Sequence, residues 1–133
     1  MRAVLDTNVF VSGLINPSGP PAEVLQCWQE GAFEAVACGA LLSELAKVTL
    51  RPHLAKRIPP DDRNEMLDFM VNRTRFVPDR PATPAVPDDP ADYYLITLAR
   101  EWDAALVTGD RHLLDLPGMP VIMRPSAFLR LLP

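Results

Sequence analysis

The chain has 133 residues, of which 48% are hydrophobic, and its net charge is −4. This length and composition predict one domain, residues 1–133, with one core. The negative charge excludes a protein that holds nucleic acid by a broad basic surface, but not a nucleic-acid enzyme whose acids bind metal. No apolar run approaches the roughly 20 residues of a membrane helix, and no signal peptide is recognisable, so we expect a cytoplasmic protein with no membrane partner.

The first half of the chain predicts strands that alternate with helices. Short apolar runs that end at an acid or a glycine indicate the strands. Helix boundaries are indicated by proline near a helix start, by Gly31 after a helix end and by the break at Pro52. Asp61 is expected to cap the helix at 59–73. The expected elements are strands at residues 2–6 and 34–38, a loop with turn residues at 7–19, and helices at 20–31, 40–50 and 59–73.

The second half begins with a segment from Phe76 to Pro90. Prolines stand at every third position of it from Pro78 onward, the period of a polyproline II helix. We expect a stiff crossover with at most an edge strand, and a partner-docking motif is the alternative. After it come helices at 89–102, from 111 and at 126–132, and strands at 104–108 and 120–123. Strands separated by helices predict an α/β fold with parallel neighbours.

The cysteines and histidines offer no clear site. Cys27 and Cys38 lie in apolar surroundings without a Cys-x-x-Cys pattern, which favours buried reduced thiols over a disulfide or a zinc site. His53 and His112 are expected at the surface or at helix caps, since no nearby residue pairs with them in the sequence.

Two acids follow apolar strands directly. Asp6 ends the first strand, and Asp110 follows the strand at 104–108 after Gly109. Ligands of open α/β sheets bind at the carboxyl ends of the strands, so both carboxylates can reach one crevice. The alternative for Asp110 is a simple cap of the next short helix, a role that is compatible with metal binding.

Two further acids lie early in helices. Glu44 and Asp92 stand near helix N-termini, where the helix dipole alone could favour an acid. Those N-termini point to the same sheet edge as the strand ends. Four converging carboxylates need a cation to stay ionised, and oxygen ligands suit Mg²⁺ or Mn²⁺. The chemistry that this cluster predicts is hydrolysis of a phosphodiester.

Polar neighbours could orient the acids and their bound waters. Thr7, Asn8 and Ser12 follow Asp6, and Thr108 precedes Asp110. Hydroxyl and amide groups of this kind support metal ligands, although turn or cap chemistry would also place them here.

An ordered set of motifs covers nearly the whole chain and resembles the PIN-domain family, in particular its VapC-like ribonuclease toxins. The motifs stand at residues 4–12, 42–46, 89–92, 106–114 and 124–129. The resemblance implies a three-layer α/β/α sandwich with a mostly parallel sheet, and a Mg²⁺- or Mn²⁺-dependent endoribonuclease. It also implies the toxin half of a prokaryotic toxin–antitoxin pair, with RNA as substrate, a small protein antitoxin as partner, and a homodimer.

The family's acidic positions carry over to four residues, which are Asp6, Glu44, Asp92 and Asp110. Asn8, Ser12 and Thr108 carry over as supporting residues. The chain departs from the family around the third acid, since Ala91 and Tyr93 flank Asp92 where members often have further acids. Asp89 is therefore an alternative to Asp92.

Rival functions lack the residues that they need. A haloacid-dehalogenase phosphatase requires a second Asp where this chain has Asn8, and a dinucleotide-binding domain requires a glycine-rich turn after the first strand. The remaining alternative is a catalytically silent PIN-like module that binds RNA or protein. The presence of all four acids argues against it.

Overall fold

The computed structural model describes residues 1–79, 93–116 and 121–133. Within these ranges five strands form one sheet in the order β3-β2-β1-β4-β5, and every pairing is parallel. The strands are β1 (Arg2–Leu5), β2 (Glu34–Cys38), β3 (Arg75–Val77), β4 (Ala105–Val107) and β5 (Ile122–Met123). The parallel sheet confirms the predicted α/β class.

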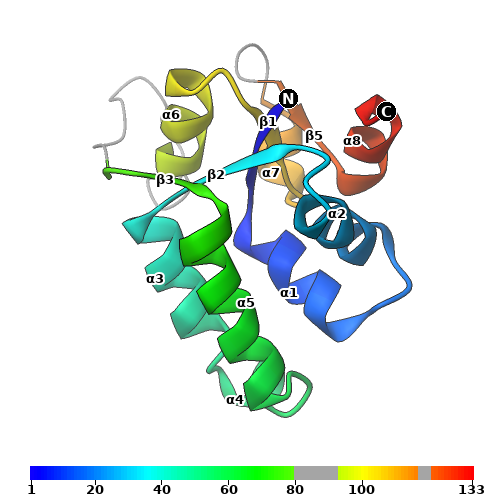
Figure 1. The fold of residues 1–133 in the computed structure, drawn as a ribbon, viewed down its shortest axis with the longest axis vertical. Helices are drawn as coiled ribbons and strands as arrows, with labels where there is room; N and C mark the ends of the chain where they lie inside the picture. Colours follow the sequence, from blue (N-terminus) through cyan, green and yellow to red (C-terminus); the bar gives the residue numbers. More distant parts are fainter. Residues whose placement is uncertain (80–92, 117–120) are drawn as a thin grey trace.

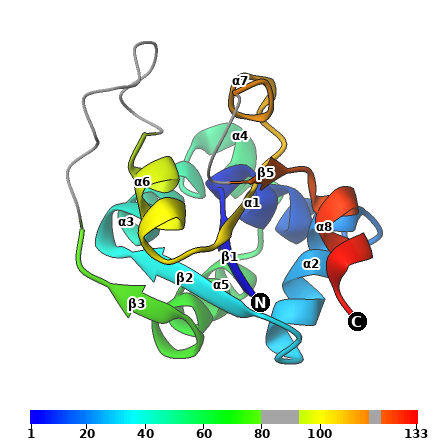
Figure 2. The same cartoon turned by 90° about the horizontal axis from the view of Figure 1, so that it is seen from above.

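Helices cover the sheet on both sides (Figures 1 and 2). Helix α6 packs on β1, β2 and β4, while α1, α3 and α5 lie across the sheet from it, and α8 packs on α2. The helices of the described ranges are α1 (Thr7–Ile15), α2 (Pro20–Gln29), α3 (Gly39–Val48), α4 (Pro52–Ala55), α5 (Pro60–Arg73), α6 (Tyr93–Glu101), α7 (Arg111–Leu114) and α8 (Pro125–Leu131). This arrangement is the predicted three-layer sandwich.

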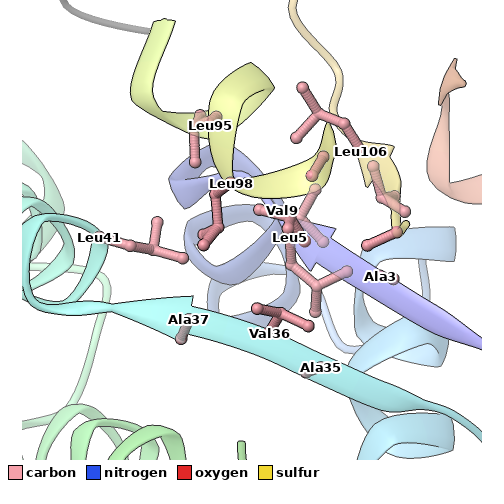
Figure 3. Close-up of a cluster of buried hydrophobic side chains, with 14 of the residues drawn as sticks. Ala3, Leu5, Val9, Ala35, Val36, Ala37, Leu41, Leu95, Leu98 and Leu106 are labelled. Carbon is pink, nitrogen blue, oxygen red and sulfur yellow. The ribbon is translucent and has the colours of Figure 1, made fainter. Parts of the chain in front are cut away.

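The core forms around β1, the middle strand. Its residues Ala3, Val4 and Leu5 are buried, as expected of a parallel strand that is covered on both faces. Figure 3 shows side chains of α1, α3 and α6 gathered with those of β1, β2 and β4 in one apolar cluster. The cluster fixes β1, and with it the position of the residue that follows the strand.

Helix α1 corrects the expectation of a loop over residues 7–19. Thr7–Ile15 is helical, although Val9 and Phe10 belong to residue types with weak helix propensity. Both side chains are buried, and the Phe10 ring meets Trp28 of α2 edge-on with a centroid distance of 5.9 Å. Tertiary packing therefore overrides the local preference.

The other elements lie close to their expected positions, with a few differences. The short helix α4, which begins at Pro52, was not predicted. Asp61 does not cap α5, because Pro59 occupies the cap position and Asp61 lies in the first turn. Strand β3 lies at the sheet edge, as predicted for the start of the proline-rich segment. The rest of that segment and the predicted helix start fall in residues 80–92, outside the described residues.

The cysteines and histidines form neither a disulfide nor a cluster that could hold a metal ion in the described residues. Cys27 and Cys38 are both free, as predicted, but only Cys38 is buried and Cys27 is half-buried. His53 and His112 are exposed on short helices, which confirms their assignment to the surface. None of the helices in the described ranges combines the length and the apolar character needed to span a membrane.

Arg63 ties α5 to the end of α3, the helix that carries Glu44. Its Nε donates to Thr49 Oγ1 at 2.9 Å, and its Nη2 donates to the carbonyl of Ala46 at 3.0 Å. We expect Arg63→Met to lower the free energy of unfolding by about 1–2 kcal/mol, measured by urea denaturation. Arg57→Met, at an exposed arginine between α4 and α5, is the control, and equal midpoints for the two variants would contradict this role.

The strand order places a topological switch point at β1. The chain passes from β1 to β2 and β3 on one side, then returns to β4 and β5 on the other. In open α/β sheets this is where a crevice opens at the carboxyl ends of the strands. The residues that follow β1 and β4 therefore meet at the place most suited to a ligand.

Candidate active site

Asp6 and Thr108 extend the pairing of β1 with β4. Leu5 is paired with Val107, and the Asp6 backbone N–H donates to the Val107 carbonyl at 3.0 Å. The two side chains that follow the strands then meet, and Thr108 Oγ1 donates to Asp6 Oδ2 at 2.7 Å. Asp6 is 5% exposed and Thr108 is 0% exposed. The sheet thus holds a nearly buried carboxylate in a fixed orientation.

Asn8 reinforces this contact from the first turn of α1. Its Nδ2 donates to Asp6 Oδ2 at 3.1 Å and to Thr108 Oγ1 at 3.3 Å. Its Oδ1 accepts from the Gly109 backbone N–H at 3.1 Å. Asn8 and Thr108 therefore lie where the sequence predicted supporting residues, directly beside Asp6.

Burial raises the pKa of Asp6 above its ordinary value. The loss of hydration disfavours the charged carboxylate, and the nearby Glu44 carboxylate disfavours it further. The hydroxyl groups of Thr108 and Thr7 act in the opposite direction by donating to it. The pKa remains raised because burial is the largest of these effects.

Glu44 reaches Asp6 through the hydroxyl of Thr7. Thr7 Oγ1 lies 3.3 Å from Asp6 Oδ1 and 3.5 Å from Glu44 Oε1, within donating distance of both. Glu44 projects from α3, so two carboxylates from separate elements share one hydroxyl group. The structure therefore brings Glu44 to Asp6, as the sequence predicted.

Tyr94 is a site residue that the sequence analysis missed. Its hydroxyl, on α6, donates to Glu44 Oε2. Burial and the contact with Glu44 raise the pKa of Tyr94, so the phenol stays protonated and acts as a donor. The available signal was a ring with a polar hydroxyl early in a predicted amphipathic helix, two positions after Asp92.

Asp110 is joined to the site through its backbone. Its N–H donates to Thr108 Oγ1 at 2.9 Å, while its side-chain Oδ1 accepts from the His112 N–H at 2.9 Å and caps α7. The cap that the sequence offered as an alternative therefore exists. Asp110 Oδ2 has no hydrogen bond with the described residues, so one oxygen is left for another ligand.

The remaining predicted site residues are Asp92 and Ser12. Asp92, and Asp89 as its alternative, lie outside the described residues. Ser12 is exposed one turn after Asn8 on α1, and its hydroxyl bonds to none of the acids in the described part of the chain.

A further strand-end acid, Asp79, was not predicted. It follows β3, and its Oδ1 accepts from the Ala40 N–H at 2.9 Å in the first turn of α3. Asp79 therefore helps to fix the helix that carries Glu44. The rule that identified Asp6 and Asp110, an acid after an apolar run, does not find it, because β3 begins with an arginine and its first two residues are exposed.

The carboxylate oxygens of Asp6 and Glu44 are the type of ligand that a hard divalent cation binds. Every side chain that hydrogen-bonds either carboxylate within the described ranges is neutral. Two neighbouring carboxylates, one of them desolvated, thus have no positively charged partner there. Within the same ranges no group of three or more acids, histidines or cysteines is close enough to hold a metal ion. Full coordination would need water, substrate or a ligand from elsewhere in the chain.

Comparisons with known proteins agree with this architecture. The chain is 29% identical over 116 residues to the uncharacterized protein MJ1680 of Methanocaldococcus jannaschii, covering 87% of this chain and 75% of that protein. It superposes on VapBC2 from Rickettsia felis, solved bound to a DNA fragment from the promoter, with a TM-score of 0.63 and 14% identity, covering 93% and 98% of the two chains. For FitAcB from Neisseria gonorrhoeae the TM-score is 0.54 and the identity 17%, over the same shares of the two chains.

A family model described as a PIN domain matches residues 2–112, a range that includes the Asp6 network and the Glu44–Tyr94 contact. The matched range covers most of the chain and all of the site residues described above. The protein belongs to the PIN-domain family.

Proposed function

We propose that the protein is a Mg²⁺- or Mn²⁺-dependent endoribonuclease. Family membership supports nuclease chemistry, because PIN domains are usually nucleases. The observation that carries the proposal is the pair of carboxylates, Asp6 and Glu44, which neutral donors alone hold together in the described part of the chain. Such a pair requires a countercharge, and a divalent cation between oxygen ligands supplies it.

Each acid has a place in this proposal. Asp6, fixed by the sheet, and Glu44, fixed by α3, would hold the cation, with Asp92 as a further ligand. Asp110 does not form a three-acid group with them in the described residues, so its Oδ2 would reach the cation through a bound water. A bound ion supplies a more acidic water and offsets the charge that builds on the phosphodiester. Thr108 and Asn8 keep Asp6 Oδ2 in one orientation, which leaves Asp6 Oδ1 directed toward the side of Glu44 and Thr7.

The substrate class is tested by a cleavage assay with the wild-type protein. Structured and single-stranded RNAs, single-stranded DNA and duplex DNA of matched sequence are incubated with Mn²⁺, Mg²⁺ or EDTA. The proposal predicts cleavage of RNA with either metal and none with EDTA. Cleavage of DNA in preference to RNA would contradict the RNA substrate, and cleavage in EDTA would contradict the metal dependence.

The proposed biological setting is a toxin–antitoxin pair. The VapBC2 and FitAcB structures with the same fold support a small protein antitoxin as the partner. A homodimer of this chain is part of the same proposal. Co-expression with the product of a neighbouring small reading frame should abolish cleavage and yield one stable complex. A catalytically silent binding module is the second candidate, and it predicts RNA or protein binding with no metal-dependent cleavage.

Tyr94→Phe tests whether the phenol positions Glu44. The variant loses one of the donors that hold the Glu44 carboxylate, so we expect about a 10-fold weaker affinity for Mn²⁺, measured by calorimetric titration. In a Glu44→Gln background the same change should have no further effect on Mn²⁺ affinity. An equal loss of affinity in both backgrounds would show that Tyr94 acts through packing rather than through Glu44.

A further inference from the structure

A pocket of about 320 Å³ opens beside the acids. It lies between α1, the start of α2 and the segments that follow β4 and β5, and Figure 1 shows α1, α2 and α8 grouped on this side of the molecule. Its volume is near the lower end of the range for ligand sites, about 300–1,000 Å³. The polar lining residues are Asn8, Ser12, Gly109, Arg124 and Ser126.

The pocket is continuous with the Asp6 network. Asn8 and Gly109 form part of its wall, and the Gly109 N–H donates to Asn8 Oδ1 at 3.1 Å. The same Asn8 side chain donates to Asp6 Oδ2 at 3.1 Å. A molecule in the pocket would therefore lie one side chain away from the carboxylate that we place at the centre of the reaction.

Arg124 gives the pocket a positive charge. It follows β5 directly, so it lies at the same sheet edge as Asp6 and Thr108. Its side chain is exposed, it is the charged member of the lining, and its guanidinium has no hydrogen bond or ion pair with the described residues. A guanidinium with free donors beside an acidic site is suited to bind a phosphate.

Two hydroxyl groups complete the polar lining. Ser12 and Ser126 are exposed, and neither side chain is hydrogen-bonded to another described residue. Arginine and serine side chains commonly contact the phosphate and sugar of a nucleic acid. Such contacts position the strand and do not read its base sequence. Ser12 would thus act on the substrate chain rather than on the metal ligands.

We propose that this pocket binds the phosphate and sugar of a nucleotide next to the scissile one in an RNA strand, with Arg124 as its phosphate-binding side chain. The proposal rests on the proposed ribonuclease function and adds the path that the RNA strand takes across the protein. From the acids, the RNA strand runs past Asn8 and Gly109 toward α8. Arg124 binds the strand through its backbone, independently of base sequence.

The test compares Arg124→Ala and Arg124→Lys with Arg130→Ala. The control removes the same charge from an exposed site on α8, the helix that follows Arg124, outside the pocket lining. Binding of a fluorescein-labelled single-stranded RNA is measured by anisotropy in EDTA at several salt concentrations. Cleavage of the same RNA in Mn²⁺ gives KM and kcat separately.

We expect Arg124→Ala to weaken RNA binding about 3- to 10-fold and to lower the salt-dependence slope by about 0.7, the value for one phosphate contact on a single strand. KM should rise with little change in kcat, because the contact forms equally in substrate and transition state. Arg124→Lys should keep most of the salt slope, and Arg130→Ala should match the wild type.

The inference is overturned if Arg124→Ala binds like Arg130→Ala, or if the wild type does not bind the RNA at any salt concentration. Failure of the proposed function would give a different result: the wild type would bind RNA through Arg124 but would not cleave it in Mn²⁺ or Mg²⁺.

Discussion

Asp6→Asn is expected to abolish RNA cleavage while the protein stays folded. Asparagine keeps the size of the side chain, and its carbonyl oxygen can accept from Thr108 and Asn8 in place of Asp6 Oδ2. Its amide can face the Thr7 hydroxyl. Loss of residues that merely support metal ligands costs about 10- to 100-fold, so loss of Asp6, the proposed central ligand, should lower the initial rate by at least about 100-fold.

Thermal unfolding separates loss of metal binding from loss of fold. In EDTA the Asp6→Asn variant should melt no lower than the wild type, because the neutral amide avoids the burial cost that raises the pKa of Asp6. Excess Mn²⁺ should stabilise the wild type, by about 2.7 kcal/mol at a hundred times Kd, and should leave the variant nearly unchanged. A variant that cleaves at the wild-type rate, or that gains equal stability from Mn²⁺, would refute the role of Asp6.

Thr108→Val is expected to lower both stability and activity. The Thr108 hydroxyl donates to Asp6 Oδ2 and accepts from the Asp110 N–H and from Asn8 Nδ2, all within a 0% exposed residue. Valine keeps the shape but leaves a buried carboxylate and a backbone N–H without this partner. We expect the free energy of unfolding to fall by about 2–4 kcal/mol. The cleavage rate should fall by about 10- to 100-fold, since Asp6 loses its closest support.

Thr97→Val provides a matched control on α6. Thr97 is 5% exposed, and its hydroxyl has no hydrogen-bond partner in the described residues. Removing that hydroxyl should leave stability unchanged or raise it by about 1 kcal/mol, measured by the same urea titration. If the two Thr→Val variants had equal effects, the Thr108 hydroxyl would be shown to contribute nothing specific.

Sequence alone locates β1, β2, β4 and β5 because each is a short apolar run with a clear end, whereas β3 begins with an arginine and was expected at most as an edge strand. Asp6 and Asp110 follow from that rule and from the edge at which parallel strands end. Helix α1 does not follow, since the local preferences of Val9 and Phe10 oppose it and only their burial beneath the sheet decides the conformation. Burial of this kind depends on partners far along the chain.

The contacts within the site show the same limit. Thr108 meets Asp6 across 102 positions, and Tyr94 meets Glu44 across 50. From the sequence, Asp6, Glu44 and Thr108 could be named as candidates for a site. Which side chains contact one another depends on the strand register and on the packing of α6, which the sequence does not give. For this reason Tyr94 was missed, whereas Asn8, only two residues after Asp6, could be named from the sequence and hydrogen-bonds Asp6 in the structure.

Cleavage of a labelled panel of structured RNAs tests the central claim most directly. Wild type, Asp6→Asn, Glu44→Gln and Asp110→Asn are compared in Mn²⁺, Mg²⁺ and EDTA, with Asp92→Asn and Asp89→Asn alongside to identify the remaining acid. The account predicts cleavage by the wild type with either metal and none with EDTA. Each of the first three substitutions should lower the rate by at least about 10-fold, with Asp6→Asn the most severe. Activity that survives both EDTA and these substitutions would contradict it.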